Sequence, residues 1–302
     1  MTGMGNGNTQ AVLDLWHVLG AVADMPLGKV RRTKLLGQPI ALAISADGAA
    51  HVWRVSGDLA DGCEFVPSMV AEPLPSQQTY GYVWTCLGTP KTDLFAIPEY
   101  AESDRRNMNA ATFLVHVSAP RAVENFLDMG HFPFVHTDYL GVESHPEVKD
   151  YTVEVSEERG EILATRCRFF QPMAALSAKG GMEVEYVYRV PHPYCAILYK
   201  SSPPAPGRLD VICIFLQPID EEHVAANMLM SVIDHDSTDT QIKAFQQMIF
   251  AQDKPILENQ VPKRLPLDPR AEMPVRADKS SIAYRRWLSE NGYTYGTIPA
   301  AA

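Results

Sequence analysis

Apolar and polar residues alternate in short runs through the first third of the chain, which is typical of strands with one buried face. Residues 39–55 (PIALAISADGAAHVWRV) predict a hairpin with Asp47 and Gly48 in its turn. Residues 79–88 (TYGYVWTCLG) predict another strand that ends in a turn, and residues 68–78 (SMVAEPLPSQQ) predict a loop between the two. We therefore expect a small β-domain in this part of the chain.

The pattern changes after a connector at residues 89–107 (TPKTDLFAIPEYAESDRRN). Residues 111–119 (ATFLVHVSA) predict a strand, and Pro120 suits the first turn of a helix that runs to about Tyr139. A series of strand candidates follows, separated by Gly, Pro, Asp and Glu at hairpin-like spacing, so we expect an antiparallel sheet. The candidates are residues 151–158, 161–171, 182–190, 195–202, 209–219 and 224–234.

The last part of the chain predicts a helix and a surface tail. In residues 235–260, Phe245, Met248, Ile249 and Ile256 recur at helical spacing and define one apolar face. The proline-rich residues 261–288 are expected to wrap the surface. We thus predict an α+β fold, with a β-domain and connector in residues 1–107 and an antiparallel sheet with two helices in residues 108–302.

Composition limits the function classes. The chain has 302 residues, of which 46% are hydrophobic, and a net charge of −10 without a stripe of Lys or Arg, so nucleic acid is not an expected partner. The longest apolar run, VICIFL, is far too short to span a bilayer, and the N-terminus lacks a signal-peptide pattern, so a cytoplasmic protein is expected. The five cysteines contain no C-x-x-C or C-x-H pair and are expected to be free thiols.

Polar side chains are concentrated in residues 122–138 (AVENFLDMGHFPFVHTD). Asn125, Asp128 and His131 recur at a step of three, as on one face of a helix, and His136 follows five residues later. A five-residue step turns a helix by about 140°, so a distortion near Pro133 is needed to bring both imidazoles to one metal. A His pair beside a carboxylate is typical of iron or zinc sites.

Two histidines are too few ligands, and the best candidate for a third is Asp253 on the second predicted helix. Two His and one carboxylate form the facial triad of non-haem iron(II) oxygenases. The spacing alone leaves open that Asp253 is paired with Lys254 or Arg264 instead. The H-x-x-x-H pattern of zinc hydrolases is absent here.

The segment ENFLDMGHFPFVH resembles the N-x-x-D-x-x-H-x-x-x-x-H signature of Rieske-type non-haem iron oxygenase large subunits, and QDKPILENQ resembles their segment with the third iron ligand. The resemblance covers nearly the whole chain and implies a helix-grip catalytic domain preceded by a Rieske-like β-domain. It implies that His131, His136 and Asp253 bind a mononuclear Fe(II). It also implies that Asp128 links a ligand His to the cluster of a neighbouring domain, and that Asn125 lines the iron site.

The sequence lacks the motifs that would bind a Rieske cluster. The cluster requires two Cys and two His in paired loops, which the family supplies as C-x-H and C-x-x-H. His51 and Cys63 are the only Cys or His residues near the position of these loops, and two groups cannot hold the cluster. We therefore expect the [2Fe–2S] cluster on another protein, so that NADH-derived electrons for O₂ activation come through a partner.

Among family members, this truncated arrangement is similar to the methylxanthine N7-demethylase subunits of bacterial caffeine breakdown. That similarity implies conversion of 7-methylxanthine to xanthine and formaldehyde, a Rieske-containing reductase as partner, and a glutathione S-transferase-like subunit in a homo- and hetero-oligomeric assembly. Three alternatives are a catalytically silent scaffold subunit, an oxygenase for another N- or O-methylated aromatic compound, and a metal-free ligand-binding module. Candidate residues for the wall around a flat purine are Phe132, Phe169, Gln171, Gln246 and Phe250.

Overall fold

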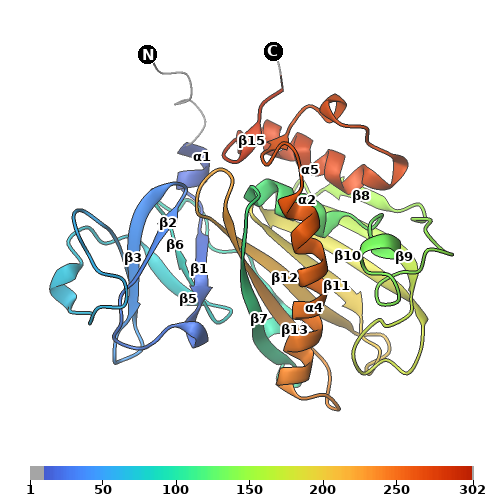
Figure 1. The fold of residues 1–302 in the computed structure, drawn as a ribbon, viewed down its shortest axis with the longest axis horizontal. Helices are drawn as coiled ribbons and strands as arrows, with labels where there is room; N and C mark the ends of the chain where they lie inside the picture. Colours follow the sequence, from blue (N-terminus) through green and yellow to red (C-terminus); the bar gives the residue numbers. More distant parts are fainter. Residues whose placement is uncertain (1–9, 301–302) are drawn as a thin grey trace.

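The computed structural model describes residues 10–300, which form a small β-domain beside a larger domain of sheet and helices (Figure 1). After the short helix α1 (Gln10–Leu13), the small domain holds two antiparallel three-stranded sheets, with strand orders β1-β6-β5 and β2-β3-β4. Their strands are β1 His17–Ala21, β2 Arg31–Leu35, β3 Gln38–Ile44, β4 Ala50–Arg54, β5 Ser76–Thr79 and β6 Tyr82–Thr85. Both sheets and the larger domain confirm the predicted α+β class.

The hairpin predicted at residues 39–55 is confirmed, because β3 and β4 pair around the turn at Asp47 and Gly48. The predictions for residues 68–88 are wrong in two respects. Tyr80 and Gly81 both adopt positive φ (56° and 78°), which reverses the chain in the middle of the predicted strand. As a result β6 folds back onto β5. Residues 76–78, which were predicted as loop, belong to β5.

The larger domain is built on a seven-stranded antiparallel sheet of order β7-β13-β12-β11-β10-β9-β8. Its strands are β7 Arg106–Val115, β8 Thr152–Val155, β9 Ile162–Gln171, β10 Met182–His192, β11 Cys195–Ser201, β12 Leu209–Pro218 and β13 Val224–Val232. Every strand predicted in this part of the chain is confirmed. The division of the chain after residue 107 stays a prediction, and β7 begins at Arg106.

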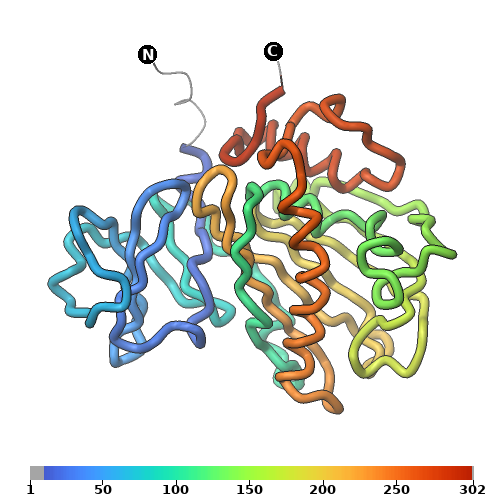
Figure 2. The backbone as a smooth tube through the Cα atoms, viewed as in Figure 1, coloured from blue at the N-terminus to red at the C-terminus, as the bar shows by residue number. Residues whose placement is uncertain are grey.

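Four helices accompany this sheet: α2 Ala119–Leu127, α3 Phe132–Val135, α4 Asp239–Glu258 and α5 Lys279–Glu290. Thr238 and Gln241 form a capping box that starts α4, which crosses the sheet beside β7 (Figures 1 and 2). The apolar face predicted for α4 is wrong at Ile256, which is 43% exposed because its side chain lies beside a depression on the surface. The remaining short elements are the 3₁₀ turns at Val22–Asp24, Pro67–Met69, Pro98–Ala101, Pro269–Ala271 and Arg276–Asp278, and the strands β14 Leu265–Pro266 and β15 Thr297–Ile298.

The C-terminal tail is more ordered than predicted. Residues 261–288 were expected to wrap the surface, but α5 buries Tyr284, Trp287 and Leu288 and packs against α2, β8 and β9. These three residues recur at helical spacing, so burying them stabilises a helix in spite of the surrounding prolines. The tail thereby holds α2 in place.

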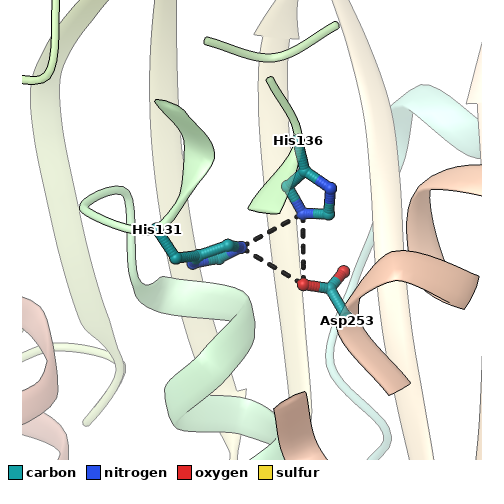
Figure 3. A group of neighbouring side chains, drawn as sticks. All are labelled: His131, His136 and Asp253. Atoms are coloured by element: carbon teal, nitrogen blue, oxygen red, sulfur yellow. Dashed lines mark hydrogen bonds and ion pairs between the residues drawn. The ribbon is translucent and has the colours of Figure 1, made fainter. Parts of the chain in front are cut away.

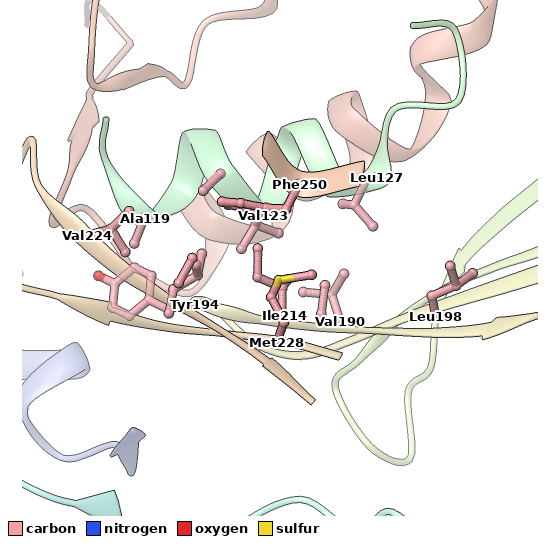
Figure 4. Close-up of a cluster of buried hydrophobic side chains, with 14 of the residues drawn as sticks. Ala119, Val123, Leu127, Val190, Tyr194, Leu198, Ile214, Val224, Met228 and Phe250 are labelled. Carbon is pink, nitrogen blue, oxygen red and sulfur yellow. The ribbon is translucent and has the colours of Figure 1, made fainter. Parts of the chain in front are cut away.

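The seven-stranded sheet is covered on both faces. On one face Ala119, Val123 and Leu127 of α2 point toward side chains of the central strands such as Val190 and Ile214 (Figure 4). On the other face, Tyr82 and Trp84 of the small domain pack on a second set of strand residues that includes Phe215. Burial on both faces explains why the central strands are almost continuously apolar.

Within residues 10–300, no helix combines the length and the apolar character that crossing a membrane requires.

Candidate metal centre

The chain breaks its helix between Leu127 and Phe132, and this break positions the first two candidate ligands. Asp128 ends α2 in an extended conformation, and its Oδ1 accepts a hydrogen bond of 2.7 Å from the backbone N–H of Gly130. His131 and His136 then flank the single turn of α3, in which Pro133 occupies the first turn. The continuous helix predicted to Tyr139 is therefore wrong, because an aspartate turn ends it before Pro133 is reached.

This break also corrects the helical face predicted for Asn125, Asp128 and His131. Only Asn125 lies within α2, whereas Asp128 ends that helix and His131 begins the next one. Asp128 and His131 are still neighbours because the turn folds the chain back on itself. The carboxylate oxygen Oδ2 of Asp128 lies 3.0 Å from Nδ1 of His131.

His131, His136 and Asp253 meet at one point between α3 and α4 (Figure 3). The Nε2 atoms of the two imidazoles are 3.2 Å apart, and Oδ1 of Asp253 lies 3.2 Å from Nε2 of His131 and 3.1 Å from Nε2 of His136. In residues 10–300 this is the only group of three or more His, Cys, Asp or Glu residues that could hold a metal ion. The alternative pairing of Asp253 is not formed, since Lys254 pairs with Glu258 and Arg264 with Glu221.

The spacing of the three atoms fits one metal ion. Three ligand atoms at about 2.1 Å from a metal and at right angles to one another lie about 3.0 Å apart. The observed separations of 3.1 to 3.2 Å are close to this value. The donor set of two imidazoles and one carboxylate is the one that non-haem Fe(II) takes, and three ligands on one side leave the other side open for oxygen and substrate.

Each imidazole is held by a second contact that fixes its tautomer. Nδ1–H of His131 donates to Asp128, and Nδ1–H of His136 donates to Oε1 of Gln252 at 2.8 Å. With a metal bound, both rings would therefore present an unprotonated Nε2 to it. Sequence reasoning missed Gln252, although its place next to Asp253 on α4 was a usable signal.

The electrostatics of the metal-free centre reflect the same contacts. Burial of the His131 ring opposes its protonation, but hydrogen bonds to Asp128 and Asp253 outweigh this and raise its pKa to about 9. For Asp253 burial acts in the opposite direction, yet the two imidazoles keep the pKa of its carboxyl below the ordinary value. The centre therefore favours a carboxylate at Asp253, as a cation site requires.

A largely apolar cavity adjoins the three ligands. Residues of α2, α3, α4 and strands β10 to β13 line it, and the predicted residues Asn125, Phe132, Gln246 and Phe250 are among them. Phe169 and Gln171 are not: the Phe169 ring packs on Tyr186 at 4.7 Å between centroids, and Gln171 donates to the Tyr186 hydroxyl at 2.9 Å. These two residues support the cavity wall from behind.

A second depression, which we call the outer hollow, lies on the other side of the centre. Arg121, Glu124, Asn125, Asp128, His131, Ile256, Glu272, Met273 and Arg285 are among the residues that line it. Asn125 and His131 border both the cavity and the outer hollow, so they form the wall between them. Asp128 is reached from the outer hollow, where 31% of its side chain is exposed.

An antiparallel sheet covered by helices, with two His and one Asp at adjoining positions beside an apolar cavity, defines a mononuclear non-haem iron oxygenase domain. Comparison with known proteins agrees with this class. Residues 115–291 match the family model of the vanillate O-demethylase oxygenase C-terminal domain. The probable methylxanthine N7-demethylase NdmC of Pseudomonas sp. (strain TJI-51) is 47% identical over 286 residues, which are 95% of this chain and 96% of that protein.

More distant relatives share the same fold. The methylxanthine N1-demethylase NdmA of Pseudomonas putida is 28% identical over 80% of this chain and 68% of its own length. The structure of Pseudomonas putida CBB5 NdmA with caffeine superimposes with a TM-score of 0.74 at 22% identity, covering 95% of this chain and 92% of that one. Dicamba monooxygenase bound to dicamba superimposes with a TM-score of 0.68 at 16% identity, covering 93% and 98% of the two chains. The chain belongs to the Rieske-type non-haem iron oxygenase family, whose members use a mononuclear iron site, and it is an oxidoreductase.

Proposed function

We propose that this chain is the catalytic subunit of a multi-component monooxygenase that removes the N-methyl group of 7-methylxanthine. The observation that carries the proposal is the triangle of His131, His136 and Asp253 beside an apolar cavity, in a chain 47% identical to a probable methylxanthine N7-demethylase. A silent scaffold subunit would have no need to keep three ligand atoms within 3.2 Å of one another.

The reaction consumes O₂, two electrons and two protons. One oxygen atom enters a C–H bond of the N-methyl group, the other leaves as water, and the resulting N–CH₂OH releases formaldehyde to leave N–H. Bound Fe(II) supplies the oxygen activation. The chain's own residues hold the ligand atoms, exclude water and orient the methyl group, which is the task of the apolar cavity walls.

Electrons have to reach this site from another protein in our proposal. The sequence offers only His51 and Cys63 where the family places its four cluster ligands. We propose the outer hollow as the docking position for a Rieske domain; Asp128 and His131 line it, and the exposed side chains of Ile256 and Met273 add an apolar rim, which supports this. We propose a Rieske-containing reductase driven by NADH as this partner, with a glutathione S-transferase-like subunit completing a hetero-oligomer.

Two measurements test the proposal. Anaerobic loading should give about one Fe(II) per chain, and the loaded protein mixed with a Rieske-bearing reductase and NADH should release formaldehyde from 7-methylxanthine. If the chain binds iron but no methylxanthine yields formaldehyde, the assignment to the oxygenase class would stand and the proposed substrate would be wrong. A chain that binds no iron would instead support the scaffold or the metal-free binding module.

The proposed role of Asp128 has its own test. Asp128→Asn should retain iron, because its one amide oxygen can still accept from His131 while the hydrogen bond from Gly130 is lost, but it should lose most of the reductase-driven turnover. Asp58→Asn, at an exposed position in the small domain, is the control and should behave as the unaltered protein. Full turnover in Asp128→Asn would refute the electron route through the outer hollow.

A further inference from the structure

One end of the cavity carries charge although its walls are otherwise mostly apolar. Lys200 on β11 and Asp210 on β12 are paired across the sheet and both face the cavity. Leu198, Ile212 and Ile214 follow on the same face of these strands and line its middle part. A charged pair in this row is therefore an exception that packing does not explain.

Both groups are almost fully buried, Lys200 with 5% and Asp210 with 6% of its surface exposed. Within residues 10–300 the Lys200 ammonium forms no ion pair or hydrogen bond, and its contacts are the through-space charge of Asp210 and the Tyr186 ring, whose centroid is 5.6 Å away. Asp210 accepts a hydrogen bond of 2.8 Å from the backbone N–H of Ile233, and the Ser202 hydroxyl and the charge of Arg105 also act on its carboxylate. A carboxylate has about four acceptor positions, so Asp210 can accept from a ligand as well. A buried ammonium without a hydrogen-bond acceptor is costly, so the position of Lys200 indicates a ligand.

The ammonium is charged at neutral pH. Burial lowers the pKa of Lys200 to about 8, against the opposing effect of Asp210. Three N–H donors are thus available on Lys200, beside the acceptor atoms of Asp210.

The charged pair and the metal ligands lie at opposite ends of the cavity. Asp210 accepts a hydrogen bond from the backbone N–H of Ile233, just before the loop that leads into α4. Arg106 holds this loop against the start of α4, because it donates to the carbonyl oxygen of Asp234 and forms an ion pair with Asp239. The charged pair therefore lies near the start of α4. Ile242 in the first turns of α4 and Asp253 near its end both line the cavity. At 1.5 Å per residue these two positions are about 16 Å apart along the helix, which leaves room for a bicyclic ring between the two ends.

We propose that Lys200 and Asp210 recognise the dione edge of the purine, with Lys200 donating to a ring carbonyl oxygen and Asp210 accepting from the adjacent ring N–H. This inference rests on the proposed function and extends it to substrate choice. In a xanthine the six-membered ring alternates carbonyl oxygens with N–H groups, while the N7-methyl group lies on the other ring and points toward the metal. Caffeine, methylated at both N–H positions of the dione ring, has no proton for Asp210.

The test is ligand binding to the iron-loaded full chain, measured by anaerobic calorimetry without a reductase. The unaltered protein should bind 7-methylxanthine more tightly than caffeine. Lys200→Met should weaken binding of both ligands about tenfold or more, as expected for loss of a hydrogen bond from a charged group. Asp210→Asn should weaken 7-methylxanthine more than caffeine and so reduce the preference. Lys149→Met, at an exposed lysine paired with Glu183, is the matched control.

Stability separates this role from a structural one. If Lys200 served the fold, Lys200→Met would lower the melting temperature. If it serves the ligand, replacing an unpaired buried charge by an apolar side chain of similar length should leave the melting temperature unchanged or raise it.

Two results with the variants would overturn the inference. The first is binding of 7-methylxanthine by Lys200→Met within twofold of the unaltered protein, and the second is an unchanged preference in Asp210→Asn. Its failure is distinct from failure of the proposed function, since formaldehyde release by the unaltered protein does not depend on either result. If the unaltered protein binds no xanthine, the inference is wrong. Formaldehyde release from another N-methylated compound would then still support an N-demethylating oxygenase.

Discussion

The ion network at the outer hollow allows the clearest stability prediction. Arg285 of α5 donates to both carboxylate oxygens of Glu124 on α2, at 2.6 and 2.5 Å, and also contacts Glu272. Both partners are shielded, with 8% of the Arg285 and 13% of the Glu124 side chain exposed. Arg208 has a similar partner set, Glu102 and Asp104, but 37% of its side chain is exposed. The two arginines therefore differ mainly in burial.

We expect Arg285→Met to lower the free energy of unfolding by about 3 kcal/mol, the lower end of the cost of leaving one partner of a buried pair uncompensated. The lower end applies because Arg121 remains 3.5 Å from Glu124. Arg208→Met should show no measurable change, because exposed pairs contribute little. Adding Glu124→Gln to Arg285→Met should recover part of the loss, since it removes the stranded charge.

Urea unfolding followed by tryptophan fluorescence measures these differences, because Trp287 is a buried residue of α5, the helix that carries Arg285. Burial raises the pKa of Glu124 despite its arginine partners, so in Arg285→Met the carboxyl is protonated more readily still. A group with a raised folded pKa costs stability as pH rises, so the deficit of Arg285→Met should shrink at low pH. Equal unfolding midpoints for Arg285→Met and Arg208→Met at neutral pH would refute this reasoning.

Three further predictions concern the centre and the fold. Gly141→Ala would place a Cβ 2.7 Å from the backbone nitrogen of Pro133, so iron content should fall, while Gly180→Ala, with open space around it, should retain iron. Gln252→Leu should weaken Fe(II) binding about 10- to 100-fold in anaerobic titration, because it removes the acceptor that orients a ligand imidazole; unchanged affinity would contradict that role. Burial lowers the pKa of His17 to about 4 from 6.5, so stability is lost as pH falls below 6.5, by about 2 kcal/mol at pH 5. His17→Gln should show a smaller loss in unfolding experiments at pH 7 and pH 5, and an equal loss would argue against His17 as the source.

The strands and the candidate metal-site residues could be predicted because each carries a local signal. Alternating or continuous apolar runs mark the sheet, and the spacing from Asp128 to His136 indicates a candidate metal-binding segment. The cause of the helix break could not be read in the same way. Pro133 was the visible breaker, but the aspartate turn onto Gly130 acts first, and that contact depends on a side-chain orientation.

Residues whose role depends on long-range packing were the ones that sequence reasoning missed. Lys200 and Asp210 lie near the ends of their strands, where a charged side chain normally faces water. Here the helices that cover the sheet enclose this position, so that both side chains line the end of a cavity. Tyr284, Trp287 and Leu288 carried a helical pattern, yet the prolines around them favoured a surface tail. In both cases the outcome depends on which element covers the residue, and the sequence does not state this locally.

Retention of the small domain can be understood from the same packing. In this chain the Cys and His residues of the domain do not form the paired C-x-H and C-x-x-H loops of a Rieske cluster, but Tyr82 and Trp84 still cover Phe215 on the back of the main sheet. The opposite face of that strand carries Asp210 and Ile214 of the cavity. Removing the domain would expose a large apolar surface directly behind the cavity, a cost of about 25 cal/mol for each Å². The cluster loops can therefore be absent while the strands stay, because the strands support the cavity and the cluster does not.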